Sequence, residues 1–299
     1  MIYPPFLQQG DAIGIIAPAR KICRKEIEFA IRWWEAKGFR IVQGKHLFAE
    51  DHQYAGTDEQ RIEDLQNMLN NSEIKAVFCA RGGYGTLRIV DKLDFLSFNL
   101  NPKWICGFSD ITVLHAHINK VCGVATMHST MPVSMNGNNP ENLETLYQLL
   151  TGNNTFYKFE FHPLNRIGKS TGELIGGNLS LLYSLSGSVS EIDTANKILF
   201  IEEVDEYLYH IDRMMLQLKR AGKLANITGL LVGSFTKMRD HEVAFGSMYE
   251  QIIREHCEEY NFPIAFGFPA GHDEQNIAMK LGAPHCLTVE NTKTTLTSE

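Results

Sequence analysis

Short, mostly apolar runs alternate with amphipathic segments through the first half of the chain. The apolar runs predict buried strands, and the segments between them space their apolar side chains as helices do. Strands that are apolar throughout are typical of a parallel sheet covered on both faces. The expected strands lie at 12–19, 40–44, 75–85, 104–109 and 123–129, and the expected helices at 25–39, 58–71, 86–93 and 110–121. We therefore expect an α/β layer of the flavodoxin or Rossmann kind, whose ligands gather beyond the carboxyl ends of its strands.

The alternation stops at Val133–Gly172, a segment rich in Asn, Gly and other polar residues around one expected helix. This composition is typical of a connection between domains. After it the pattern predicts a second, mixed α/β domain with more β character, because the last residues alternate like exposed antiparallel strands. The boundaries that we expect are 1–135 for the N-terminal domain, 136–170 for the crossing and 171–299 for the C-terminal domain.

Composition changes this picture little. A length of 299 residues suits two domains, and the hydrophobic fraction of 44% and charged fraction of 21% are ordinary for a globular protein. The net charge of −7 gives no electrostatic reason to expect nucleic acid or an anionic membrane as a partner. The start of the chain does not resemble a signal peptide, and no apolar run approaches the roughly 20 residues of a membrane span. We therefore expect a cytoplasmic protein. The six cysteines are scattered and form no CxxC pair, which favours small core residues over a zinc site or a disulfide frame.

Ser109 lies where the apolar run WICGF ends and the amphipathic segment DITVLHAH begins. A side chain at such a turn projects from the carboxyl edge of the sheet, near the positive end of a helix dipole, and can act as a nucleophile. The match to a GxSxG motif is incomplete, because Ile111 takes the place of the second glycine. A serine before Asp-Ile-Thr is also a good N-cap. From this stretch alone both interpretations stand.

Three further stretches carry polar chemistry at the ends of apolar runs. Arg81–Arg88 (RGGYGTLR) brings adjacent glycines whose N–H groups could face an anion, although a tight turn needs the same residues. In LFIEEVDE, Glu202 and Glu203 point to opposite faces of the expected strand, and such a charge run is often simply solvated. His272 follows a glycine in an expected loop, where an imidazole can titrate near neutral pH or merely lie at the surface.

Together these stretches resemble the LD-carboxypeptidase family of serine peptidases, which also contains the microcin-immunity peptidases. The resemblance runs from GDAIGIIAPA to LGAP, over most of the chain. It is carried by ARGGYG, GFSDIT, GELIGGNLSLL, residues Leu199–Met215 and FGFPAGH, in that order. Several widely spaced motifs in the right order make a far more specific match than any one of them.

The resemblance implies a Ser–Glu–His triad. Ser109 would be the nucleophile, His272 the general base and later the acid, and Glu202 the carboxylate that holds the imidazole. The choice of Glu202 over Glu203 comes from the family pattern, since periodicity cannot select between them. The N–H groups of Gly83 and Asp110 would form the oxyanion hole. The residues implied near the substrate are Gly82, Gly176, Gly177 and Asn178. This chemistry needs no metal and no organic cofactor.

The resemblance also implies a substrate. Members of the family cleave the bond between the L-centre of diaminopimelate or lysine and a terminal D-alanine in cytoplasmic muropeptides, which serves peptidoglycan recycling. The immunity branch hydrolyses a peptidyl-nucleotide amide and tends to carry aromatic residues in its central loop. The stretch SMNGNNPENLETL (134–146) contains no tryptophan, and all three tryptophans, Trp33, Trp34 and Trp104, lie in the first domain, which favours the muropeptide substrate. A non-catalytic two-lobed binding protein is the alternative from another class. We expect a small peptide as partner, with a homodimer as a further hypothesis.

Overall fold

The chain forms two compact units in a computed structural model that describes residues 1–137 and 139–298. The first unit comprises Met1–Asn153 together with Ile277–Leu281, and the second comprises Asn154–Asn276 and the stretch from Gly282 onward. The division after Asn153 falls inside the segment 136–170 that we expected as the crossing; one residue of that segment, 138, lies outside the described residues. The short stretch 277–281 differs from the expected boundaries, because it joins the first unit from far along the chain.

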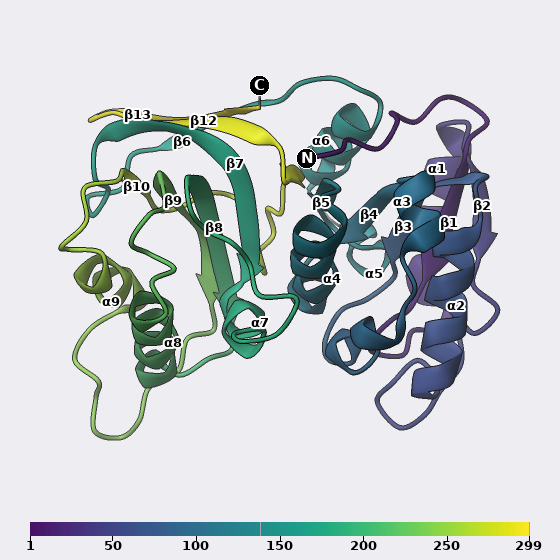
Figure 1. The fold of residues 1–299 in the computed structure, drawn as a ribbon, viewed down its shortest axis with the longest axis horizontal. Coiled ribbons are helices and arrows are strands. Elements are labelled where there is room, and N and C mark those ends of the chain that lie inside the picture. The colour runs from purple at the N-terminus through teal and green to yellow at the C-terminus, as the bar shows by residue number, and fades with distance from the viewer. Residues whose placement is uncertain (138, 299) are drawn as a thin grey trace. The chain divides into compact units, whose positions relative to one another are not determined.

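The first unit is built on a six-stranded sheet (Figure 1). Strand order is β11-β5-β4-β3-β1-β2, parallel throughout except for β11, which runs antiparallel to β5. Every residue of β1 and β4 is buried, as expected of strands covered on both faces. The strands are β1 (Ala12–Ile16), β2 (Arg40–Gln43), β3 (Ile74–Cys79), β4 (Trp104–Gly107), β5 (Thr126–His128) and β11 (Met279–Leu281).

Amphipathic helices supply the rest of this core. Trp34 of α1 packs against Phe78 of β3, and both side chains are fully buried. Helix α2 begins at a capping box, in which Thr57 accepts a hydrogen bond from the Gln60 backbone and Gln60 returns one to the Thr57 N–H. The helices are α1 (Arg24–Ala36), α2 (Asp58–Asn70), α3 (Leu96–Leu100), α4 (Thr112–His117), α5 (Pro132–Met135) and α6 (Pro140–Leu150).

Two expected helices of this unit differ from the prediction. Residues 86–93 form two separate 3-10 turns, η1 (Thr86–Arg88) and η2 (Val90–Lys92), and no α-helix. The segment 110–121 is helical but changes its winding along its length, from the 3-10 turn η3 (Ser109–Ile111) through α4 to the π-helical turn η4 (Ile118–Cys122).

The second unit contains a seven-stranded mixed sheet of order β10-β9-β8-β7-β12-β13-β6. Its β10, β9, β8 and β7 are mutually parallel, and β12, β13 and β6 continue the sheet antiparallel. Helices α7, α8 and α9 complete the unit (Figure 1), with α8 packed against both of the others. The bounds are β6 (Phe156–Glu160), β7 (Gly168–Asn178), α7 (Leu179–Ser184), β8 (Lys197–Val204), α8 (Leu208–Arg220), β9 (Gly229–Thr236), α9 (Tyr249–His256), β10 (Ile264–Ala265), β12 (Pro284–Val289) and β13 (Lys293–Ser298).

The expected fold class, a parallel α/β domain followed by a mixed α/β domain with more β character, is confirmed. Parallel strands end at a common edge, which brings the loops that follow them together. In the first unit the glycine turn after β3 and Ser109 after β4 share one edge, because β3 and β4 are neighbours. In the second unit Asn178 of β7 is the register partner of Glu202 on β8. Among the described residues, no helix combines the length and apolarity needed to cross a membrane.

Candidate active site

Ser109 adopts a left-handed backbone conformation at the turn that leaves β4. Its φ is 62°, a region that non-glycine residues rarely occupy and that costs on the order of 1–3 kcal/mol. Phe108, the N-cap of η3, makes no side-chain capping bond, and Ile111 is the N-cap of α4. Ser109 therefore does not hold an N-cap position. A strained serine at a sharp strand-to-helix turn is the geometry of a nucleophile elbow.

The glycine turn 82–85 lies directly against this serine. A Cβ added to Gly82 would lie 3.2 Å from the Cβ of Ser109 and 3.4 Å from both its Oγ and the Asp110 nitrogen. Gly83 has a φ of +110°, so its backbone takes a path that side chains disfavour. The first unit thus brings Gly82, Ser109 and Asp110 together. That the N–H groups of Gly83 and Asp110 form an oxyanion hole stays a prediction.

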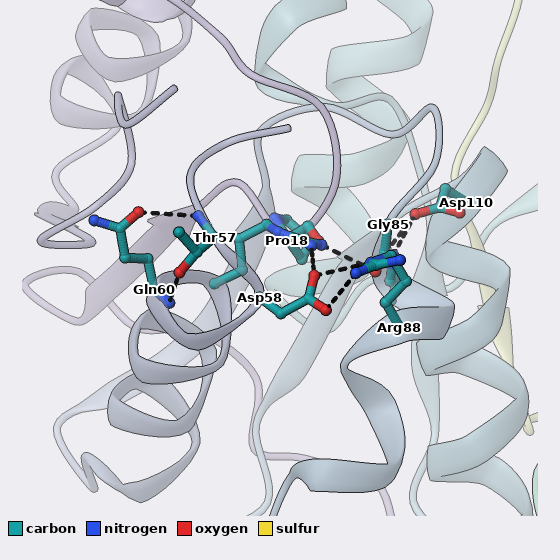
Figure 2. A network of polar contacts seen from close by, with 9 residues as sticks. Pro18, Thr57, Asp58, Gln60, Gly85, Arg88 and Asp110 are labelled. Carbon is teal, nitrogen blue, oxygen red and sulfur yellow. Dashed lines mark hydrogen bonds and ion pairs between the residues drawn. The ribbon is translucent and has the colours of Figure 1, made fainter. Parts of the chain in front are cut away.

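The side chain of Asp110 links the serine turn to the glycine turn (Figure 2). Its Oδ2 accepts hydrogen bonds from the Thr86 backbone N–H at 2.9 Å and from the Thr86 hydroxyl at 2.6 Å. Burial raises the pKa of Asp110, although both bonds from Thr86 act in the opposite direction. Two short bonds to one buried carboxylate fix the residue after Ser109 relative to the residue after the glycine turn.

Arg61 of α2 also binds the glycine turn. Its buried guanidinium donates to the carbonyls of Pro18 and Gly85, at 2.8 and 2.9 Å, and forms an ion pair with Asp58. Asp58 in turn binds Arg88 through two bonds of 2.9 and 2.8 Å (Figure 2). The network ties the loop after β1, the start of α2 and the glycine turn into one unit of structure. Sequence reasoning missed it, although Asp58 and Arg61 stand three residues apart at the start of an expected helix.

Glu202 and His272 form a close pair in the second unit. The distance from His272 Nδ1 to Glu202 Oε2 is 2.7 Å, with the Glu202 side chain fully buried and that of His272 20% exposed. Burial lowers the pKa of His272, but the charge of Glu202 and its hydrogen bond outweigh burial and raise the pKa above the ordinary value of 6.5. Because an ionised carboxylate can only accept, this hydrogen bond favours the tautomer with the proton on Nδ1, which leaves Nε2 of a neutral imidazole as an acceptor.

The backbone around this pair explains its geometry. The pairing of β8 with β9 shifts register between Ile201 and Glu203, an irregularity of the kind that re-aims side chains next to active sites. Gly271, which precedes His272, has a φ of +127°. A Cβ there would lie 2.3 Å from the Ser234 hydroxyl and 3.0 Å from Glu202 Oε2. Only glycine allows the histidine loop to approach the carboxylate this closely.

Glu203 forms its hydrogen bonds around the start of α7. Its carboxylate accepts hydrogen bonds from Asn178 Nδ2, the Val204 N–H and both the N–H and the hydroxyl of Ser180, at 2.7–2.9 Å. Burial, and after it the charge of Glu202, raises the pKa of Glu203. The strand-end carboxylates are therefore both buried, in contrast to the solvated charge run that sequence alone also allowed.

The expected substrate-binding residues of the second unit also stabilise its structure. Asn178 caps α7 by accepting from the Leu181 N–H, besides its bond to Glu203. A Cβ on Gly176 would lie 1.9 Å from the Phe200 carbonyl oxygen, so a glycine lets β7 lie close to β8. Gly177 follows it with a φ of 144°. Contact of Gly82, Gly176, Gly177 or Asn178 with a substrate stays a prediction.

The described residues include no group of three or more His, Cys, Asp or Glu side chains that could hold a metal ion.

Comparison with known proteins identifies the family. The model of the LD-carboxypeptidase N-terminal domain matches residues 13–129, and that of the LD-carboxypeptidase C-terminal domain matches residues 171–287. The chain belongs to the LD-carboxypeptidase family. This LD-carboxypeptidase family member is 38% identical to the "probable murein peptide carboxypeptidase" of Bacillus subtilis, over 97% of this chain and 92% of the relative. The expected family is thereby confirmed.

Two further relatives show the range of the family. The crystal structure of muramoyltetrapeptide carboxypeptidase from Oxalobacter formigenes matches with a TM-score of 0.88 and 25% identity, over 96% of this chain and 98% of that one. The microcin C7 self-immunity protein MccF of Escherichia coli is 24% identical, over 98% of this chain and 95% of the relative. A structure of that self-immunity protein matches with a TM-score of 0.88 at 21% identity, so the fold is common to proteins named for murein peptides and for microcin immunity.

Proposed function

We propose that this family member is a serine carboxypeptidase that removes the terminal D-alanine from a muropeptide tetrapeptide by cleaving an L,D bond. The observation that carries the proposal is the pair of Glu202 and His272, a fully buried carboxylate 2.7 Å from an imidazole nitrogen. A carboxylate that orients a histidine is the supporting half of a serine triad. The left-handed conformation of Ser109 at a strand-to-helix turn supports the role of nucleophile.

In the proposed reaction Ser109 Oγ attacks the carbonyl carbon before D-alanine, while His272 Nε2 takes the hydroxyl proton. The negative charge that develops on the carbonyl oxygen is stabilised by the N–H groups of Gly83 and Asp110. When the C–N bond breaks, His272 gives the proton to the amine of D-alanine. Water then hydrolyses the acyl-enzyme, with His272 acting again as base. Glu202 keeps the imidazole oriented and stabilises its positive charge in both steps.

The substrate class is inferred from the relatives. The Bacillus subtilis relative and the Oxalobacter formigenes structure are named for murein peptide and muramoyltetrapeptide carboxypeptidases. Such peptides would reach this enzyme during peptidoglycan recycling in the cytoplasm, which we propose as its location. A homodimer stays a prediction, as do the absence of a nucleic-acid or membrane partner and independence from metals.

The second candidate function is hydrolysis of a peptidyl-nucleotide amide. The match to a microcin self-immunity protein supports this second candidate. The stretch 134–146 argues against it, because it contains no tryptophan or other aromatic side chain on which a nucleobase could stack. The two substrates differ enough that one assay separates them.

The test is mass spectrometry of the products from three substrates: an L,D-tetrapeptide, a D,D-pentapeptide and a peptidyl-adenylate analogue. We expect loss of one D-alanine from the tetrapeptide alone. Ser109→Ala should lower turnover about 10⁴-fold or more, whereas Ser72→Ala, at an exposed serine before β3, should retain it. Cleavage of the adenylate instead would support the second candidate. A fully active Ser109→Ala variant would refute the serine mechanism.

A further inference from the structure

Arg20 lies across the glycine turn that the proposed function uses as an oxyanion hole. It follows β1 at the carboxyl edge of the first sheet, and its N–H donates to the Gly82 carbonyl at 3.3 Å. A Cβ on Gly83 would lie 2.1 Å from Arg20 Cδ and 2.5 Å from its Cγ. The aliphatic part of the exposed side chain therefore covers Gly83, whose neighbour Gly82 touches Ser109.

The charge of Arg20 distinguishes it from the other basic residues on the segments that hold this turn. In the part of the chain that the structure describes, Arg20 forms no ion pair, whereas each of the others has a carboxylate partner. These pairs are Lys21 with Glu50, Arg61 with Asp58, Arg81 with Glu26, and Arg88 with Asp58. An exposed guanidinium without a carboxylate is available to an anionic ligand.

A carboxypeptidase differs from an endopeptidase in that its substrate carries a carboxylate one residue beyond the scissile carbonyl. Consecutive Cα atoms are about 3.8 Å apart, so this carboxylate lies close to Ser109 and the oxyanion hole when the peptide reacts. Arginine binds carboxylates through two parallel N–H···O bonds. We propose that Arg20 binds the terminal carboxylate of the substrate and so restricts cleavage to the last residue. The inference rests on the proposed function and adds to it a specificity-determining residue.

The experiment compares kcat and KM for two substrates: the stem tetrapeptide with a free terminal carboxylate and the same peptide ending in D-alaninamide. We expect the wild-type protein to prefer the free acid. Arg20→Gln should raise KM for the acid about 10- to 100-fold, the range of a lost charge-assisted bond, and leave the amide nearly unaffected. Arg20→Lys should fall between them, because an ammonium keeps the charge without the planar fork.

The matched control is Arg24→Gln. Arg24 is also exposed and forms no ion pair among the described residues, but its guanidinium lies 4.8 Å from the Phe48 ring centre. It should behave as wild type on both substrates. If Arg20→Gln slows acid and amide equally, Arg20 only supports the turn, and if it slows neither, the residue is irrelevant; either result overturns the inference. A wild-type protein that leaves the tetrapeptide uncut overturns the proposed function, and the inference with it.

Discussion

Exchanging the carboxylate of Glu202 for an amide tests the candidate site most directly. Glu202→Gln keeps the size of a side chain that is fully buried, and an amide oxygen can still accept the His272 proton at the 2.7 Å separation. The substitution removes the negative charge beside an imidazole that becomes positive in the proposed reaction. The variant therefore separates charge from shape.

The size of the effect follows from the geometry. Two unit charges about 4 Å apart attract by about 4 kcal/mol at an effective dielectric constant of about 20. Each 1.36 kcal/mol changes a rate about tenfold, so kcat should fall about 10³-fold. The pKa of His272, which the charge of Glu202 raises, should fall as well. Because the base must be neutral, the acid limb of kcat/KM should move to lower pH in the variant.

Glu203→Gln is the matched control, one residue along the same strand. An amide there would turn an NH₂ group toward donors such as Ser180 and Asn178, which leaves buried donors unsatisfied. Each costs about 1–3 kcal/mol, so we expect a lower unfolding temperature with kcat changed only a few-fold. The assay measures tetrapeptide turnover across pH and thermal unfolding for both variants. If Glu203→Gln abolishes turnover and Glu202→Gln does not, with both folded, the assignment of the triad carboxylate is wrong.

Three other predictions concern the glycine turn, a buried histidine and metals. Gly83→Ala should lower kcat about 10²- to 10³-fold, because the backbone φ of +110° and the contact of the new Cβ with Arg20 would displace the Gly83 N–H from the oxyanion. Steady-state kinetics that match wild type would contradict the oxyanion role. The Nε2 of buried His115 lies 2.9 Å from the Gly107 carbonyl oxygen, and burial lowers the pKa of His115 to about 4. Its contribution to stability should therefore decline as pH falls from 6.5 to about 4, by at most about 1.4 kcal/mol per pH unit. The sign follows because only the unfolded state binds the proton in that range; urea midpoints of wild type and His115→Gln should converge toward acid pH, and parallel curves would refute the reasoning. Dialysis against EDTA should leave hydrolysis intact, and activity lost to EDTA and restored by zinc would indicate a metallopeptidase.

The strands of the first sheet could be predicted because they are buried on both faces, which leaves continuous apolar runs at β1, β3 and β4. The turns η1 and η2 could not. Residues 86–93 have helical spacing, but the Thr86 N–H is taken by the Asp110 carboxylate and Arg88 is held by Asp58. These tertiary bonds, which no local pattern records, favour two tight turns over a helix.

The candidate site was predictable where it depends on strand ends. Ser109 and the glycine turn end neighbouring parallel strands, and their order along the chain already indicates a shared edge. Alternation along β8 showed that Glu202 and Glu203 differ in direction, but only the structure shows their partners, His272 and Ser180. The spacing of Asp58 and Arg61 is typical of an ion pair within a helix, but no local pattern predicts that Arg61 also binds the distant carbonyls of Pro18 and Gly85.

Strand β11 has a consequence for how this chain can be made and divided. It pairs with β5 and contributes Lys280, whose ammonium lies 5.1 Å from the Phe6 ring centre, yet it is synthesised more than 120 residues after Asn153. During translation β5 therefore remains an unpaired edge strand of the first sheet until nearly the whole chain has left the ribosome. A fragment ending at Asn153 keeps that edge permanently, and open edges promote aggregation. Co-expression with a peptide spanning 277–281 should improve its solubility, which makes the boundary between the two units a poor place to cut the gene.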